Sequence, residues 1–364
     1  MKLSDQEYKR KQLAFWSLEH VESPLIGFTI GKGVDSWSYW QYNKATSELF
    51  SKKQIMAEDI DTNTFVDDQK SYLYNSNQVD DDVYRTAMPL ASIPWMEAIL
   101  GCPVISSGEN LKAGKFINDP AELQKINFSS ENPWVKKYCE FIEVYERSLN
   151  GQFPVGQSVL RGPADLACAL LGAEEATIAL LVQPDEMKDL LEYVTDHLEQ
   201  FLRYQLSILP KFKDGYVVGQ YEIWAPEPVI RIQEDFSTLY SPELYQEFLK
   251  PLDKILAGIS PYSLIHLHSS SLFLIEHFLS VSKIRAFQVT KDPGEVKLQS
   301  MIPALQKIQD NNRPLIIKGQ FDKEDIGLLK ANLSVNGLCV QPVVRSLEEA
   351  NELLPLLRKW DETN

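Results

Sequence analysis

The sequence predicts an α/β protein, a single (β/α)8 TIM-type barrel with an N-terminal helical extension. From residue 153 onward, apolar strand-like runs alternate with helical segments about six times. No stretch rich in glycine, proline or serine separates them. The earlier run PLIGFTI and one weaker strand bring the number of strands near eight, the number in such a barrel. We therefore expect one domain over residues 1–364, with residues 1–22 as the N-terminal extension.

The first part of the chain contains more helix signals than strand signals. Its acidic runs, Asp67–Asp68 and Asp80–Asp82, have the composition of solvated loops and lack the spacing of a calcium loop. The elements expected here are a helix over residues 5–20, a buried strand over residues 24–33, a buried helix over residues 93–104 and an amphipathic helix over residues 131–149.

From residue 153 onward, several elements carry their own start or stop signals. Pro163 near the first helical position, Asp165 in the first turn and Gly172 at the end delimit one helix. Ser346 and Glu349 form a capping-box pattern before the closing helix. The elements expected are the strand FPVGQSVL, helices over residues 163–172 and 184–209, the strand GYVV with the loop QYEIWAPEP, a helix from SPELYQEFLKPL, the strand SLIHLH, the helix LFLIEHFLSV, the strand IRAFQV, a helix over residues 297–311, the strand PLIIKG, a short helix, the strand GLCVQPV and the helix SLEEANELLPLLRKW.

The composition excludes several classes of function. With 36 basic and 51 acidic side chains, the formal net charge is −15, which argues against binding nucleic acid or an anionic membrane through bulk charge. The four cysteines are scattered without a C-x-x-C pair, so neither a disulfide scaffold nor a zinc ribbon is expected. The N-terminal MKLSDQEYKRKQ lacks the apolar core of a signal peptide, and no apolar run approaches the roughly 20 residues that span a bilayer. We expect a cytoplasmic protein with a small-molecule substrate and no nucleic-acid or membrane partner.

The segment Ser263–Pro293 contains the strongest functional signal. Its run SLIHLH places His266 and His268 two residues apart, and alternate residues of a strand point to the same face. The carboxyl ends of the strands form the site of a barrel enzyme. Histidines at such a place bind a metal, bind substrate or transfer protons without a metal, or serve a structural role, and these three interpretations stay open. Lys291 and Asp292, after the next strand, are typical of a surface turn.

Other strand ends supply further candidates. Glu222 and Trp224 in QYEIWA combine a carboxylate and an indole, which suit substrate positioning, and the alternative is a loop acid beside a packed Trp. Arg161 suits an anionic group of a substrate, or an ion pair with a nearby acid. Cys339, in the apolar run GLCV, has the pattern of a buried structural thiol.

Taken in order, several segments resemble the uroporphyrinogen decarboxylase superfamily, which includes zinc-dependent methyltransferases that act on methylcobalamin. RGPADLACALLG is similar to the family's G-P-x-T-L helix start. The long helix PDEMKDLLEYVTDHLEQFLRYQL precedes GQYEIWA, as in the family the long helix precedes a strand with an acid and Trp. EDFSTLYSPELYQEFLKPLDKI is similar to the S-P-x-x-F-x-E-F-x-x-P helix, and the His266 segment lies where members have H-x-C-G. The resemblance extends over residues 153–358 and implies a barrel enzyme.

Two departures from the family pattern narrow the expected function. The decarboxylase has an arginine-rich loop, R-Q-A-G-R, after its first strand, whereas this chain has GFTIGKGVD with only Lys32, which disfavours a substrate with many carboxylates. The methyltransferases hold zinc through His-x-Cys and a distant Cys. His266 matches the His, His268 stands in place of the first Cys, and Cys339 matches the second. The resemblance thus implies a zinc site of His266, His268 and Cys339 with an open fourth position.

The resemblance also implies the activity. Glu222, Tyr240 and Arg161 are the expected catalytic residues, and Trp224 and Arg161 are expected to bind the substrate. We expect a metal-dependent methyltransferase that moves a methyl group from a corrinoid (methylcobalamin), held by a carrier protein, to a thiol or similar acceptor. The alternatives are a metal-free decarboxylase-like lyase for a smaller carboxylated substrate, with a histidine as proton donor, and a non-catalytic barrel that binds a ligand or a corrinoid protein.

Overall fold

The computed structural model describes residues 4–31, 44–108, 110–294 and 296–360. Its central element is a parallel sheet with the strand order β1-β12-β11-β10-β9-β8, in which β2 also pairs with β12. The strands of this sheet are β1 (Leu25–Ile26), β2 (Thr29–Ile30), β8 (Val229–Gln233), β9 (Tyr262–His268), β10 (Ala286–Lys291), β11 (Leu315–Gly319) and β12 (Leu338–Val344).

Two further segments close this sheet into a barrel. A backbone hydrogen bond of 2.7 Å from Asp82 joins the segment 82–87 to β1. A parallel bridge joins the same segment to residues 154–158. The Gln157 side chain then bonds to both backbone groups of Arg231 on β8, at 2.9 and 3.0 Å. The (β/α)8 barrel predicted from the sequence is therefore confirmed, with these two segments in place of regular strands.

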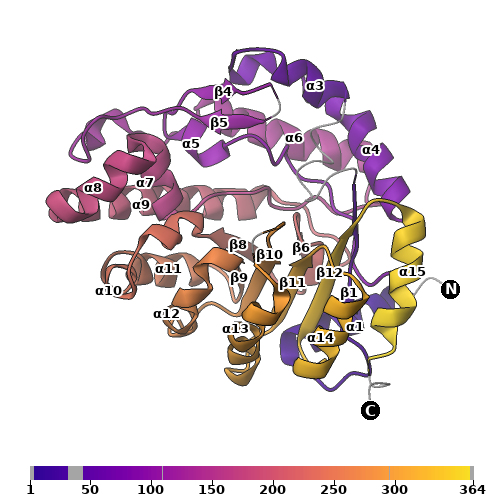
Figure 1. The fold of residues 1–364 in the computed structure, drawn as a ribbon. Helices are drawn as coiled ribbons and strands as arrows, with labels where there is room; N and C mark the ends of the chain where they lie inside the picture. The colour runs from indigo at the N-terminus through magenta and orange to yellow at the C-terminus, as the bar shows by residue number, and fades with distance from the viewer. Residues whose placement is uncertain (1–3, 32–43, 109, 295, 361–364) are drawn as a thin grey trace.

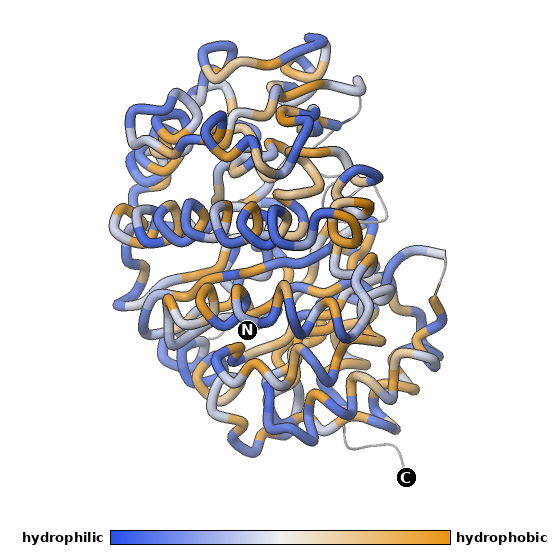
Figure 2. The backbone as a smooth tube through the Cα atoms, turned by 90° about the vertical axis from the view of Figure 1, so that its left-hand side faces the viewer, coloured by the Kyte–Doolittle hydropathy of each residue, from blue (hydrophilic) through white to orange (hydrophobic). Residues whose placement is uncertain are grey.

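Helices flank the barrel, and a layer of helices with the β4–β5 hairpin lies over one end of it (Figure 1). Along the helices the chain alternates between hydrophobic and hydrophilic stretches, as expected where one side packs on the core (Figure 2). The helices are α1 (Asp5–Ser17), α3 (Lys44–Phe50), α4 (Thr64–Ser76), α5 (Trp95–Ile99), α6 (Pro133–Leu149), α7 (Pro163–Leu171), α8 (Ala173–Val182), α9 (Pro184–Ile208), α10 (Pro242–Leu244), α11 (Lys250–Ala257), α12 (Ile275–Leu279), α13 (Leu298–Asp310), α14 (Lys323–Asn332) and α15 (Leu347–Arg358).

Several predicted helix boundaries are confirmed by their caps. Helix α7 begins at Pro163 and is followed directly by Gly172 as its C-cap. Before α15, Ser346 accepts a hydrogen bond from the amide of Glu349 at 3.2 Å. The predicted N-terminal helical extension is α1, which buries Phe15 and Trp16 against the starts of the barrel strands. The buried helix expected over residues 93–104 is shorter, because only α5 is helical there.

Two short sheets lie outside the barrel. Strands β3 (Gln54–Ile55), β4 (Val104–Ser106) and β5 (Leu111–Ala113) form one antiparallel sheet. Strands β6 (Tyr216–Val218) and β7 (Ile223–Ala225) form a hairpin, where the sequence predicted one strand and a loop. The turn of this hairpin places Tyr221 inside the barrel, where the Gln341 side chain of β12 donates to its carbonyl at 2.7 Å.

The barrel interior changes from apolar to polar along the strands. Because alternate residues of a strand share a face, positions two residues apart lie one above the other on the inner wall. The first inward positions are buried and mostly apolar: Val229, Leu264, Ala286, Ile316 and Cys339. The positions two residues later are buried and polar: Arg231, His266, Gln288, Lys318 and Gln341. Buried polar groups need partners, so this second layer is where a site is built.

Some expectations for the first part of the chain need correction. Asp81 and Asp82, expected in a solvated loop, are 2% and 0% exposed. Asp82 pairs with Lys11 at 2.7 Å and with Arg358 at 2.6 Å, so distant counter-charges stabilise it inside the fold. Lys32 lies outside the described residues. Among the helices of the described ranges, none is long and apolar enough to cross a membrane.

Candidate metal site

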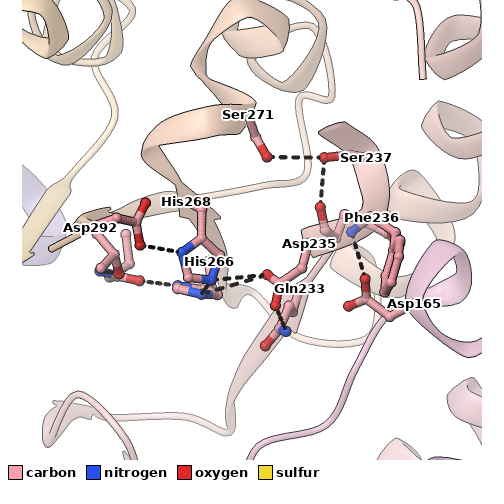
Figure 3. A network of polar contacts seen from close by, with 12 residues as sticks. Asp165, Gln233, Asp235, Phe236, Ser237, His266, His268, Ser271 and Asp292 are labelled. Atoms are coloured by element: carbon pink, nitrogen blue, oxygen red, sulfur yellow. Dashed lines mark hydrogen bonds and ion pairs between the residues drawn. The ribbon is translucent and has the colours of Figure 1, made fainter. Parts of the chain in front are cut away.

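Two histidines and one aspartate converge at the carboxyl ends of neighbouring strands (Figure 3). His266 and His268 occupy the last inward positions of β9, and their Nε2 atoms lie 3.3 Å apart. Asp235 follows β8, which pairs with β9. Its Oδ1 lies 3.7 Å from Nε2 of His266 and 3.6 Å from Nε2 of His268. Three atoms that commonly bind metals therefore surround one small space.

Neighbouring residues hold the other atoms of these side chains. His268 Nδ1 donates to Asp292 Oδ1 at 2.6 Å, and Asp292 accepts from the amide and hydroxyl of Ser269 at 2.9 and 2.5 Å. His266 Nδ1 contacts the side-chain oxygen of Gln288 on β10. These outer contacts orient both rings so that Nε2 is directed toward Asp235, as in metal sites where a second group fixes each imidazole. Asp292, expected in a surface turn, is thus part of the site.

Burial and two carboxylates set the charges of the site. Burial and the nearby Arg231 guanidinium lower the pKa of His266 to about 3, so this imidazole is neutral. Burial opposes the charged form of His268, but Asp235 and Asp292 outweigh it and raise the pKa of His268 to about 10. Burial opposes ionisation of Asp235, yet the hydrogen bond and charge of His268 lower the pKa of Asp235 to about 2. Without a metal, the site holds one imidazolium between two carboxylates.

The donor set fits a divalent metal ion such as zinc. Asp235 Oδ1 is shielded from solvent, and its polar neighbours among the described residues are the two Nε2 atoms at 3.7 and 3.6 Å, so a metal ion between them would satisfy all three atoms. Zinc binds histidine nitrogen and carboxylate oxygen at roughly 2.0–2.2 Å, so tetrahedral ligand atoms lie about 3.3–3.5 Å apart. The separations here are 3.3–3.7 Å. Three protein ligands leave a fourth position for a substrate.

A cavity of about 330 Å³ opens beside the three ligands. This volume lies within the roughly 300–1,000 Å³ of small-molecule sites. Its walls come from the carboxyl ends of β8–β12 and from residues 91–94, 97 and 110–111 of the layer above them. Arg161, Lys291 and Lys318 also line it, and two of these cations have acidic partners, since Arg161 pairs with Glu97 and Lys291 pairs with Asp325 at 2.7 Å.

The structure brings His266 and His268 together with Asp235, and the expectation of Cys339 as the third ligand needs correction. Cys339 is fully buried in the apolar layer with Leu264. Leu264 precedes His266 by two residues, a step of about 6–7 Å along a strand. Cys339 therefore lies one layer away from the histidine nitrogens, and burial raises the pKa of its thiol well above its ordinary value.

Glu222 and Trp224, expected to act on the substrate, are absent from the described lining of the cavity. They lie on the β6–β7 hairpin and not at the carboxyl end of a barrel strand. Glu222 pairs with the fully buried guanidinium of Arg85 at 2.6 Å. The Trp224 indole donates to the carbonyl of Phe212 at 3.0 Å. Both contacts are structural.

The two remaining candidates differ in their positions. Tyr240 is 2% exposed and lies outside the described lining of the cavity, so the structure gives it no contact with a substrate there. Arg161 lines the cavity and pairs with Glu97 at 3.0 Å. Its position agrees with a substrate-binding role and with the alternative ion pair.

Asp235 is the functional candidate that the sequence interpretation missed. The preceding run VIRIQ is the buried strand β8, for which the sequence interpretation predicted no element. Its β-branched residues directly after Pro228 were the available signal. Had this strand been recognised, the acidic pair Glu234–Asp235 would have stood at a strand end next to His266.

Comparisons with known proteins support the family resemblance. The family model described as uroporphyrinogen decarboxylase (URO-D) matches residues 89–208, which begins earlier than the segment expected from the motifs. A comparison with curated protein sequences gave no significant match. The solved structure of a methyltransferase from Methanosarcina mazei has a TM-score of 0.65 and 11% identity, and the match covers 97% of this chain and 98% of that one.

A second solved structure is more distant. The type I 3-dehydroquinate dehydratase from Clostridium difficile has a TM-score of 0.26 and 13% identity, covers 47% of this chain and 77% of its own, and supports no inference. The uroporphyrinogen decarboxylase model thus matches one segment of this chain, and the methyltransferase structure shares its fold over nearly the whole length.

Proposed function

We propose that this chain is a metal-dependent methyltransferase that moves a methyl group from a corrinoid (methylcobalamin), held by a carrier protein, to a thiol or similar small acceptor. The observation that carries the proposal is the cluster of Asp235, His266 and His268, whose ligand atoms lie within 4.8 Å of one another beside a cavity. The fold shared with the Methanosarcina mazei methyltransferase supports the same activity.

In this proposal, Asp235, His266 and His268 hold a zinc ion, and each protein group has a separate task. Zinc, when bound, would supply Lewis acidity that lowers the pKa of a thiol toward neutrality. Asp292 fixes the His268 ring through the 2.6 Å hydrogen bond to Nδ1. Arg161, on the cavity wall, holds an anionic part of the acceptor.

The size of the cavity assigns different places to the two reactants. A volume of about 330 Å³ accommodates a small acceptor and is too small for a whole corrinoid. The carrier protein would therefore present the methyl group at the cavity mouth. In the transfer, the acceptor thiol would lose its proton to solvent, its sulfur would form a bond to the methyl carbon, and the cobalt–carbon bond of the donor would break with its electron pair left on cobalt.

The test is anaerobic demethylation of methylcobalamin, followed by its absorbance, with zinc-loaded protein and a panel of small thiols. The wild type and Cys339→Ser should both produce methylated thiol, and Asp235→Ala should not. Absence of transfer by zinc-loaded wild type across the panel would count against the proposal. Equal rates with and without Asp235 would also contradict it.

A metal-free lyase is the second candidate, because His268 is an imidazolium in the same cavity as Arg161. Arg161 would hold a carboxylate of the substrate while His268 protonates the carbon that loses carbon dioxide. Carbon dioxide release from small carboxylated substrates should then survive treatment of the protein with a chelator. Loss of that release on chelation would exclude this mechanism.

A further inference from the structure

We propose that Tyr221 is a further substrate-binding residue, whose hydroxyl donates a hydrogen bond to the negatively charged atom of the acceptor beside the metal ligands. The inference rests on the proposed function, since it concerns an acceptor in the same cavity. Tyr221 directly precedes Glu222 in the sequence and was not among the candidates predicted from the motifs.

The β6–β7 hairpin places Tyr221 between opposite walls of the barrel. Its backbone carbonyl accepts from Gln341 of β12 at 2.7 Å, and its hydroxyl lies 2.9 Å from His266 Nδ1 on β9. The residue is 1% exposed and lines the cavity. Tyr221 is therefore held by its backbone carbonyl and by its hydroxyl, and the hydroxyl lies beside the metal ligand His266.

The hydrogen bonds around His266 determine which atom carries a proton. Gln288 Nε2 donates to the hydroxyl of Thr290 at 3.1 Å, which directs Gln288 Oε1 toward His266 Nδ1. An amide oxygen only accepts hydrogen bonds, so Nδ1 must carry the hydrogen. Ligation of a metal through Nε2 requires the same arrangement of an imidazole.

In the part of the chain that the structure describes, this arrangement leaves the phenolic proton of Tyr221 without an acceptor. Because His266 Nδ1 carries its single hydrogen, directed at Gln288 Oε1 or shared with the Tyr221 oxygen, Nδ1 cannot accept the phenolic proton of Tyr221. The Arg231 Nε–H, 3.4 Å away, is a second donor to the same oxygen. Among the described residues, no other group forms a hydrogen bond with this hydroxyl. The proton is therefore available to a ligand in the cavity.

The surroundings of Tyr221 favour an acceptor atom with negative charge. The buried Arg231 guanidinium lies 5.8 Å from the ring centroid, and the Lys318 ammonium lies 5.6 Å from it. Two cations near the same ring stabilise an anion such as a thiolate or a carboxylate oxygen. A hydrogen bond to a charged atom is also stronger than one between neutral groups.

The test uses cobalt(II) as the metal and 2-mercaptoethanol as the probe, with the thiolate–cobalt absorption as the readout. Wild type and Tyr221→Phe should each take up one cobalt, and the variant should bind the thiol about tenfold more weakly or worse. Tyr138→Phe is the matched control. Its hydroxyl also accepts a buried hydrogen bond, from Ser158 at 3.0 Å, but lies outside the described cavity lining, so thiol affinity should equal that of the wild type.

The outcomes separate this inference from the proposed function. Failure of the wild type to take up cobalt would overturn the proposed function. Cobalt uptake with equal thiol affinity in wild type and Tyr221→Phe would overturn only the role of Tyr221. Loss of cobalt from Tyr221→Phe would show that the hydroxyl supports His266 and would also overturn the substrate contact.

Discussion

Metal binding should release one proton per chain, and that proton should come from His268. Its pKa is raised to about 10, whereas His266 and Asp235, with pKa values lowered to about 3 and about 2, are already deprotonated at neutral pH. Only the deprotonated imidazole nitrogen can bind a metal. Metal affinity should therefore rise about tenfold per pH unit between pH 6 and 9 and level off near pH 10.

The number of protons distinguishes this site from a pair of ordinary histidines. With the usual pKa of about 6.5, two histidines would together release about 0.06 proton at pH 8. The structure instead predicts the release of about one proton per metal ion bound at pH 8. The folding stability of the metal-free protein should depend on pH in the opposite direction to metal affinity. The raised pKa of His268 contributes stability that is complete below about pH 6.5 and is lost as the pH rises through about 10.

Calorimetric titration of zinc at pH 8, in two weakly chelating buffers of different ionisation enthalpy, measures this proton directly. The control is Asp292→Asn, which removes one of the two carboxylates that raise the pKa of His268 and should reduce the proton release. Binding with a release near 0.06 proton would refute the charge assignment while leaving the metal site intact.

Three further predictions concern the scaffold around the site. A Cβ on Gly162 would lie 1.8 Å from the carbonyl oxygen of Gln233, so Gly162→Ala should lower the melting temperature. Gly327 in α14 has open space around it, so Gly327→Ala should raise the stability by roughly 0.5–1 kcal/mol. Equal melting temperatures of the two variants would contradict this prediction. Arg85→Met leaves two buried carboxylates without their counter-charge and should cost about 3–5 kcal/mol in urea unfolding, and a change below about 1 kcal/mol would contradict it. Burial raises the pKa of Asp253 to about 7, so its contribution to stability is complete below about pH 4 and is lost as the pH rises to about 7. Asp253→Asn should flatten that part of the pH dependence by up to about 1.4 kcal/mol per pH unit, measured by denaturant unfolding at several pH values, and an unchanged slope would exclude this group as its source.

The sequence contained enough information for the barrel and for two of the three proposed metal ligands. Strands β9 to β12 are compact apolar runs separated by helices with clear periodicity, and His266 and His268 follow from the period of two within β9. The segments at 82–87 and 154–158 contribute only isolated bridges, so local pattern describes them poorly.

The sequence motifs did not identify Asp235 as the third ligand, and the reason is geometric. Spacing along the chain aligned Cys339 with a family cysteine, but the layer of the barrel interior that a residue occupies depends on strand register. Cys339 pairs with Leu25 and Ile316 in the apolar layer. Asp235 becomes a neighbour of His266 only through the pairing of β8 with β9.

Burial of charge was the other feature that composition could not indicate. The run at residues 80–82 has the composition of a loop, but Asp82 meets Lys11 and Arg358 from the two ends of the chain. Such contacts join residues far apart in sequence, so they depend on the complete fold. Glu222 on the β6–β7 hairpin is similar, because its partner Arg85 lies on the barrel segment 82–87, far away in the sequence.

The most direct test of the central claim is elemental analysis of the full chain after exposure to zinc, with Asp235→Ala and Cys339→Ser alongside. The three-ligand site predicts about one zinc per chain in the wild type and in Cys339→Ser, and loss of that zinc in Asp235→Ala. Zinc that survives Asp235→Ala but is lost in Cys339→Ser, or a wild type that takes up no metal, would contradict it.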